Sequence, residues 1–156
     1  MRQRLHLRGR ADLFRRLTLG SFERIASDFD AADRQILVGV RPVKGLAPSC
    51  CDQLPTPLAE RVSIAGMSDG TRDQLHLALR LAAIERHLDK GEPLPLLLDD
   101  VLVHVDDDRA RAALEILCEL SAKTQVLFFT HHSRLVELAQ LAGGARVKVH
   151  ALTGRG

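Results

Sequence analysis

Two apolar segments of the chain end in side chains that could carry phosphate chemistry. The segment LPLLLDD ends in Asp99 and Asp100, and the segment TQVLFFTHH ends in Thr130, His131 and His132. Mg²⁺ prefers one or two carboxylates together with phosphate oxygens, so Asp99 could hold the ion through its water shell while Asp100 faces the reacting centre. Each segment alone is ambiguous, because two acids can simply begin a capped loop and a histidine at a strand end is often a hydrogen-bonded surface residue.

A small polar turn, Ser68-Asp69-Gly70-Thr71, directly precedes a long helical pattern. Gly70 permits a close approach of the backbone, Ser68 offers a hydroxyl, and the N-terminus of a helix carries about half a positive charge toward an anion. The turn could therefore face a phosphate group. Ser68 or Asp69 could also act as an ordinary N-cap of the helix.

Alternating strands and helices would position these side chains. Five apolar residues recur at helical spacing and predict a helix that runs to about His87: Leu75, Leu79, Ala82, Ala83 and Leu88. The expected elements after it are the strand LPLLLDD, a helix capped by Asp106 or Asp107 and ending near Ser121, the strand TQVLFFTHH, a helix near Ser133 to Ala142 and a strand near Arg146 to Ala151. The first two strands are expected to be buried on both faces. This order predicts a parallel α/β sheet, in which ligands bind at the carboxyl ends of the strands.

The first third of the chain has a different pattern. The segment from Arg2 to Leu17 can form a helix, although Gly9 weakens the pattern. Two β-prone stretches, Phe22 to Phe29 and Ile36 to Val40, predict a hairpin joined by a polar turn. The density of proline from Pro42 to Pro57 predicts a loop.

Charge and composition narrow the class of protein. A net charge of +2 does not mark the whole chain as a nucleic-acid binder, but six arginines stand against one acid between Met1 and Leu17. These arginines could contact DNA phosphates or form a solvated helix face. Cys50, Cys51 and Cys118 match neither a disulfide framework nor a zinc spacing, which favours a reducing cytoplasm. No apolar run approaches the roughly 18 residues of a membrane span, so we expect no membrane anchor.

The order of these segments resembles the C-terminal half of an ABC-type ATPase head. The chain looks most like the SMC, RecF and SbcC branch, whose heads sit on long coiled coils, and in particular like the YhaN-type AAA family ATPases. The similarity is carried by MSDGTRDQL with RLAAIE and by DDVLVHVDDDRA with FFTHH, and it spans about Leu17 to Ala139. It implies an α/β fold: the C-terminal lobe of a P-loop NTPase, with a mainly parallel sheet and flanking helices, preceded by a short β hairpin and a helical N-terminal segment.

By this resemblance, Met67 to Thr71 is the signature motif. In the family this motif reaches across a dimer interface to the γ-phosphate of ATP held by the other subunit. Asp69 stands in place of the usual second glycine, and Arg72 could neutralise its charge. The residues that would contact nucleotide here are Ser68, Gly70 and Thr71.

The two strand ends correspond to the family's hydrolysis site. Asp99 resembles the Walker B aspartate on the Mg²⁺ shell, and Asp100 stands where most ABC ATPases have a glutamate that orients the attacking water. Asp106 matches the D-loop aspartate and is expected to belong to the nucleotide-binding residues, and His131 matches the switch histidine that contacts the γ-phosphate. The resemblance assigns no role to His132.

The motif GxxxxGK[ST] does not occur in the sequence, so the resemblance implies a Walker A lobe elsewhere. We expect residues 18–156 to be the C-terminal lobe of a larger ATPase in DNA repair or chromosome maintenance, and residues 1–17 to be the returning end of its coiled coil. The isolated chain is expected to be inactive. The expected cofactors are ATP and Mg²⁺, and the expected partners are the N-terminal Walker A lobe of the same parent protein, a second copy joined through ATP, DNA and a nuclease subunit.

Two alternatives remain open from the sequence. One is a metal-dependent nuclease or phosphoesterase, which leaves the turn after Met67 unexplained. Its ligands would be Asp99, Asp100, Asp106, Asp108, His131 and His132. The other alternative is a non-catalytic lobe that dimerises or binds DNA through its arginines.

Overall fold

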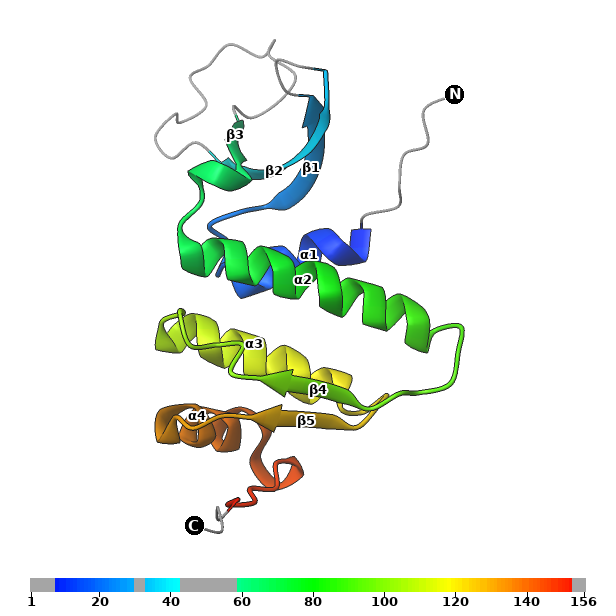
Figure 1. Ribbon diagram of the computed structural model, residues 1–156, viewed down its shortest axis with the longest axis vertical. Helices are drawn as coiled ribbons and strands as arrows, with labels where there is room; N and C mark the ends of the chain where they lie inside the picture. The colour runs from blue at the N-terminus through cyan, green and yellow to red at the C-terminus, as the bar shows by residue number, and fades with distance from the viewer. Residues whose placement is uncertain (1–7, 30–32, 43–58, 153–156) are drawn as a thin grey trace, which may run out of the picture. The chain divides into compact units, whose positions relative to one another are not determined.

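The chain forms two compact units, Met1–Ile84 and Glu85–Gly156. They are seen in a computed structural model that describes residues 8–29, 33–42 and 59–152, with side chains from residue 12 onward (Figure 1). Arg2, Arg4 and the pair Cys50 and Cys51 lie outside the described residues, as does the loop expected between Pro42 and Pro57 except for Pro42 itself.

The first unit combines two helices with an antiparallel sheet. Its elements are α1 (Arg8–Leu17), β1 (Arg24–Phe29), β2 (Gln35–Pro42), β3 (Ala59–Ser63), the 3-10 turn η1 (Ile64–Gly66) and α2 (Asp69–Leu88), whose last residues belong to the second unit. The strand order is β1-β2-β3, with β1 and β3 both antiparallel to β2. The predicted hairpin is therefore confirmed as β1 and β2, and the predicted long helix is confirmed as α2. The sequence did not predict β3, which pairs with the second edge of β2.

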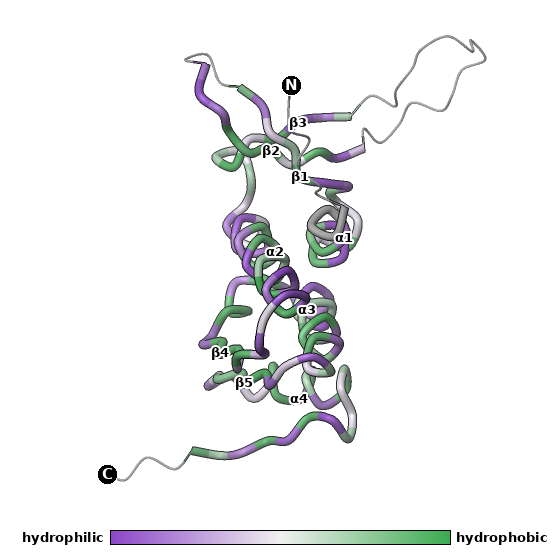
Figure 2. Tube along the Cα trace, turned by 90° about the vertical axis from the view of Figure 1, so that its right-hand side faces the viewer, coloured by the Kyte–Doolittle hydropathy of each residue, from purple (hydrophilic) through white to green (hydrophobic). Residues whose placement is uncertain are grey.

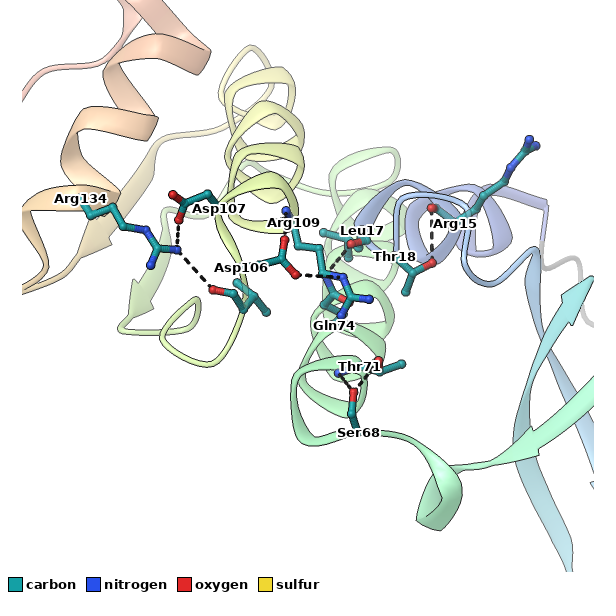
Figure 3. Close-up of polar contacts among 11 residues, drawn as sticks. Arg15, Leu17, Thr18, Ser68, Thr71, Gln74, Asp106, Asp107, Arg109 and Arg134 are labelled. Atoms are coloured by element: carbon teal, nitrogen blue, oxygen red, sulfur yellow. Dashed lines mark hydrogen bonds and ion pairs between the residues drawn. The ribbon is translucent and has the colours of Figure 1, made fainter. Parts of the chain in front are cut away.

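Buried aromatic and polar contacts hold the first unit together. The rings of Phe14 and Phe22 lie 5.2 Å apart, centroid to centroid, and join α1 to the start of the sheet. At the end of α1, the Thr18 hydroxyl donates to the Phe14 carbonyl at 2.8 Å. The buried Gln74 side chain of α2 donates through Nε2 to the Leu17 carbonyl at 2.5 Å (Figure 3). This contact satisfies one of the carbonyls that a helix C-terminus leaves without an intrahelical partner.

The second unit is built on a parallel strand pair. Its elements are β4 (Leu96–Asp99), α3 (Asp107–Leu120), β5 (Val126–Phe129), α4 (Ser133–Gly143) and the 3-10 turn η2 (Gly144–Arg146). The parallel pairing runs from Leu96 opposite Val126 to Asp99 opposite Phe129. Helix α3 packs against α4 and against β5, and both helices lie on the same side of the strand pair (Figures 1 and 2). The predicted order of strand, helix, strand and helix is confirmed.

Two details of the predicted parallel sheet are wrong. First, β4 and β5 are not buried on both faces, because Leu97 is 62% exposed, Leu127 37% and Phe129 40%. These alternate positions share one face of the strand pair, whereas Leu98 on the opposite face is buried. Second, no strand forms near Arg146 to Ala151: the chain makes the turn η2 and then continues without regular structure to residue 152.

Within the described residues, no helix is long and apolar enough to cross a membrane.

Gly39 lies where the sheet of the first unit has no room for a side chain. A Cβ atom at this position would lie 2.7 Å from Met67 Cε and from two ring carbons of Phe22, and both neighbours are buried. We expect Gly39→Ala to lower the free energy of unfolding by about 1–3 kcal/mol, because overpacking forces buried side chains off their preferred rotamers. Urea unfolding followed by circular dichroism measures the change.

Gly66→Ala is the matched control, since its added Cβ would meet its nearest neighbour, Val62 Cγ1, at an ordinary 3.4 Å. The urea midpoint should fall for Gly39→Ala and stay within error for Gly66→Ala. Equal midpoints for the two variants would show that the contact of Phe22 and Met67 across Gly39 is not tight.

Candidate functional site

The carboxyl ends of β4 and β5 bring the predicted strand-end residues together in the second unit. Asp99 is the last residue of β4, has an exposed side chain and lies opposite Phe129 in the strand register. Asp99 also shares the sheet face of the exposed Leu97, because side chains alternate along a strand. The predicted placement of the acid pair at the carboxyl ends of parallel strands is therefore what the structure shows.

Asp100 leaves the strand in a backbone conformation that few residues other than glycine adopt. Its φ is 46°, and its backbone N–H donates to the Phe129 carbonyl at 3.0 Å. Aspartate tolerates the left-handed region better than most residues because its short side chain can form local hydrogen bonds. Strand β4 therefore ends at Asp99, directly before this turn.

A direct contact joins Asp100 to His131. The Nδ1 atom of His131 lies 2.7 Å from Oδ2 of Asp100, and the histidine side chain is 72% exposed. Burial raises the pKa of the Asp100 carboxyl, but hydrogen bonds from Thr130 and His131 outweigh burial and hold this pKa below its usual value. The carboxylate is therefore ionised at neutral pH and orients the imidazole through Nδ1, which leaves the other ring nitrogen for a ligand.

His132 and Thr130 complete the group, although the resemblance to an ATPase head assigned a role to neither residue. The backbone N–H of His132 donates to the Thr130 hydroxyl at 3.2 Å, and the rings of His131 and His132 lie 3.9 Å apart, centroid to centroid. Two buried atoms, Asp100 Oδ1 and His132 Nε2, have no hydrogen-bond partner in the part of the chain that the structure describes. The signal in the sequence was the adjacency of Thr130, His131 and His132 at one strand end.

Asp106 has a structural contact that the sequence did predict. Its side chain caps α3 by accepting from the Arg109 backbone N–H at 3.0 Å, and it also pairs with the Arg109 guanidinium at 3.3 Å. Arg134 of α4 contacts both the loop before this cap and the start of α3. It donates to the Val105 carbonyl and ion-pairs with Asp107 (Figure 3). These contacts fix the course of the chain between the acid pair and α3.

The turn at Ser68 belongs to the first unit. Ser68 Oγ lies 2.9 Å from the hydroxyl of the buried Thr71, and the Thr71 N–H donates to Ser68 Oγ at 3.4 Å (Figure 3). Ser68 thus stands at the N-cap position of α2, as the sequence allowed. Arg72 pairs with the exposed Asp69, so the charge that replaces a glycine of the expected motif is neutralised locally. Gly70 is half-buried in the first turn of the helix.

Only part of the ligand set expected for a metal-dependent nuclease is brought together. Among the described residues, one group of at least three His, Cys, Asp or Glu side chains is close enough to share an ion, and it consists of Asp100, His131 and His132. Asp99, Asp106 and Asp108 are not members of this group. A second, carboxylate-bridged metal position, which two-metal phosphate chemistry requires, is therefore not formed by the described residues.

Comparisons of sequence show similarity to two curated proteins, although no family model matches the chain. The chain is 42% identical over 72 residues to the uncharacterized protein YhaN of Bacillus subtilis (strain 168), and 39% identical over 84 residues to the DNA replication and repair protein RecF of Synechococcus sp. (strain JA-3-3Ab). The matched segments make up 44% and 53% of this chain. They span only 7% of YhaN and 21% of RecF.

Comparisons of structure show similarity to heads of SMC ATPases. An SMC ATPase from work on ATP-driven dimerization and DNA-stimulated activation matches with a TM-score of 0.58 at 19% identity, over 85% of this chain and 70% of that one. The Smc head domain with an extended coiled coil, bound to the C-terminal domain of ScpA from Pyrococcus furiosus, matches with a TM-score of 0.55 at 19% identity, over 85% and 29%.

A third structure, an Smc head bound to the C-winged helix domain of ScpA, matches with a TM-score of 0.58 at 18% identity. The match covers 85% of this chain and 36% of that one. At such identities the structural similarity shows the fold alone. The sequence similarity to YhaN and RecF agrees with it. The predicted resemblance is therefore confirmed: the chain carries part of the ABC-type ATPase head fold of the SMC and RecF class.

Proposed function

We propose that this chain supplies the C-terminal half of an ATP-hydrolysing site in a larger SMC- and RecF-like ATPase. The observation that carries the proposal is the 2.7 Å contact between His131 Nδ1 and the ionised Asp100 carboxylate, next to Asp99 at the ends of paired parallel strands. This contact holds an acid and an imidazole at the edge of an α/β sheet where ligands commonly bind. Because His131 is largely exposed, the pair is suited to binding a ligand rather than to packing in the core.

The donor set at this edge fits Mg²⁺ and ATP. Mg²⁺ gives up its waters reluctantly and is usually held by one or two carboxylates plus phosphate oxygens, and Asp99 offers one exposed carboxylate of that kind. When bound, Mg-ATP supplies the phosphoanhydride bond that is hydrolysed. In this proposal Asp99 holds the ion through its water shell, as the Walker B aspartate.

Asp100 and His131 then have separate roles at the reacting end of the nucleotide. The Asp100 carboxylate accepts a hydrogen bond from the attacking water and orients it, in place of the usual glutamate. Because Asp100 already holds Nδ1 of His131, the other ring nitrogen can contact the γ-phosphate. Asp100 has a left-handed backbone conformation and its carboxyl lies beside His131, and in this proposal that position offsets the shorter side chain of aspartate.

The turn at Ser68 acts on nucleotide held by a second copy of the protein. Ser68 lies at the N-terminus of the 20-residue helix α2, where backbone N–H groups and the helix dipole favour an anion. The pairing of Asp69 with Arg72 removes the repulsion that an isolated carboxylate would exert on phosphate. Thr71 supports this turn through its hydroxyl contact with Ser68, Gly70 allows the backbone to approach, and the loop at Asp106 contributes the D-loop.

In this proposal, the Walker A lobe of the same parent protein is the partner that covers the open sheet face. Leu97, Leu127 and Phe129 lie exposed on the face that also carries Asp99. Exposed hydrophobic patches beside a polar site mark binding surfaces. A lobe that brings the phosphate-binding loop to Asp99 would cover these side chains and complete the site.

The relatives support a proposal for the wider setting of this chain. One matched SMC structure concerns ATP-driven dimerization and DNA-stimulated activation, and RecF is a DNA replication and repair protein. We infer that the parent of this chain dimerises through ATP and works on DNA in the cytoplasm, in DNA repair or chromosome maintenance, with residues 1–17 as the end of a coiled coil and a nuclease subunit as a further partner. Phosphate contacts by the N-terminal arginines would make such DNA binding strongly salt-dependent.

The acid pair provides the test of this function. In the protein that contains both this chain and a Walker A segment, Asp100→Asn should slow ATP hydrolysis about a hundredfold or more while leaving ATP binding intact, because the loss falls on the transition state. Asp99→Asn should weaken Mg²⁺-dependent ATP binding itself. Binding is measured with a fluorescent ATP analogue and turnover by phosphate release.

Asp108→Asn is the matched control, since Asp108 is an exposed acid in the first turn of α3 and outside the cluster at the strand ends. It should leave both quantities unchanged. Equal losses of binding in Asp99→Asn and Asp100→Asn would refute the division of roles, and a loss of activity in Asp108→Asn would favour the nuclease ligand set.

Ser68→Arg tests the action of the turn on a second copy. The bulky side chain at the N-terminus of α2 should abolish ATP-driven dimerisation of the parent protein while each copy still folds. Size-exclusion chromatography with ATP, on the hydrolysis-slow Asp100→Asn background, detects the dimer. Ser27→Arg places the same side chain at an exposed position of β1 and should leave dimerisation intact. Undiminished dimerisation of Ser68→Arg would show that this turn only caps its helix.

A further inference from the structure

Asp100, His131 and His132 form a cluster with the composition of a transition-metal site. Each offers one ligand atom, and the three atoms lie within 4.8 Å of one another. The cluster sits where the chain leaves β4 and β5, so both halves of it are held by the strand pairing. The hydrogen bond from the His132 N–H to Thr130 Oγ1 and the contact of the Asp100 N–H with the Phe129 carbonyl fix the backbone on either side.

Two buried polar atoms of the cluster are unsatisfied. Asp100 Oδ1 and His132 Nε2 are both buried, and neither has a hydrogen-bond partner among the described residues. Buried polar atoms in folded proteins nearly always have a protein, water or ion partner, because an unsatisfied buried group costs about 1–3 kcal/mol. An ion bound within the cluster would supply a partner for both atoms. Of the three residues in the cluster, the ATPase role proposed above uses Asp100 and His131 and gives His132 no function.

The chemistry of the donors selects the kind of ion. Imidazole nitrogens suit Zn²⁺, Ni²⁺, Cu²⁺ and Fe²⁺, whereas Mg²⁺ prefers an all-oxygen shell. Three protein ligands, two of them histidines and one a carboxylate, are a set that Zn²⁺ accepts with its fourth position left for water or a substrate oxygen. We propose that Asp100, His131 and His132 bind a divalent transition-metal ion of the Zn²⁺ type in preference to Mg²⁺.

Binding at this cluster has a consequence that rests on the proposed ATPase function. The ion would replace the contact between Asp100 Oδ2 and His131 Nδ1, so neither side chain could then serve the nucleotide. Zn²⁺ would therefore inhibit ATP hydrolysis by the parent protein, and Asp99, which lies outside the cluster, would remain free for Mg²⁺. Metal binding itself requires no nucleotide and no second lobe.

Titration of the full 156-residue chain with Co²⁺ and Zn²⁺ tests the site directly. Cys50→Ser and Cys51→Ser are introduced into every protein used, so that adjacent thiols do not compete for the ion. We expect one ion per chain by calorimetry, visible Co²⁺ absorption of the intensity typical of four-coordinate geometry, no sulfur-to-cobalt charge-transfer band, and no displacement by excess Mg²⁺.

Three variants locate the site, with circular dichroism as the check on folding. Asp100→Asn, His131→Gln and His132→Gln should each weaken the affinity roughly tenfold or more, since even the loss of an outer-sphere partner costs 10–100-fold. His131 is largely exposed, so its variant is the one least able to disturb folding. His150→Gln removes an exposed histidine outside the cluster and should bind like the parent chain.

Unchanged affinity in His131→Gln and His132→Gln, or binding that His150→Gln weakens equally, would overturn the site, as would the absence of stoichiometric binding by the parent chain. Because the titration contains no ATP, a failure here leaves the ATPase proposal standing. Conversely, tight metal binding together with normal ATP turnover of the Asp100→Asn parent protein would refute the ATPase proposal but not the metal site.

Discussion

Parallel pairing of β4 with β5 is the constraint on which the candidate site depends. The register from Leu96 opposite Val126 to Asp99 opposite Phe129 makes both strands end at one edge. The N–H of Asp100 is then bound by the last carbonyl of β5, and the Asp100 carboxylate meets the His131 ring at 2.7 Å. Because the strand pair fixes both backbones, this contact costs little further ordering of the chain, and the ionised carboxylate can hold the ring in one orientation.

Within the described residues of the second unit, helices cover this strand pair on one side only. Helix α3 packs against β5, and both helices lie on the same side of the strand pair, whereas Leu97, Leu127 and Phe129 stay exposed on the face opposite the buried Leu98. A two-stranded sheet is marginal by itself, so the stability of this unit comes mainly from the buried faces of its helices. Asp99 lies on the same face of the sheet as these exposed hydrophobic side chains. Cover of the hydrophobic surface and completion of the proposed nucleotide site would therefore occur together. A lobe that buries the first would also reach the second.

Sequence periodicity was sufficient for the long elements and for the edge at which the acids lie, because α2 and α3 are amphipathic and the strands are short apolar runs bounded by polar residues. It failed where pairing depends on distant parts of the chain. The segment AERVS of β3 is polar and becomes a strand by joining the edge of β2. Burial of β4 was overestimated, since an apolar run cannot show which face has a covering element. The contact of His131 with Asp100 and the grouping with His132 depend on the left-handed turn at Asp100, which has no periodic signature.

Calorimetry with Mg-ATP tests most directly whether the nucleotide site is divided between this chain and a separate Walker A lobe. The titration is done on the 156-residue chain alone and again after mixing it with a polypeptide that carries the Walker A segment of its parent. A divided site predicts weak nucleotide binding and no measurable turnover for the chain alone, since the other lobe of the proposed ATPase would supply the backbone amides and lysine that complement the β- and γ-phosphates. It predicts that the mixture regains both binding and hydrolysis. Micromolar binding with turnover by the chain alone would contradict a divided site.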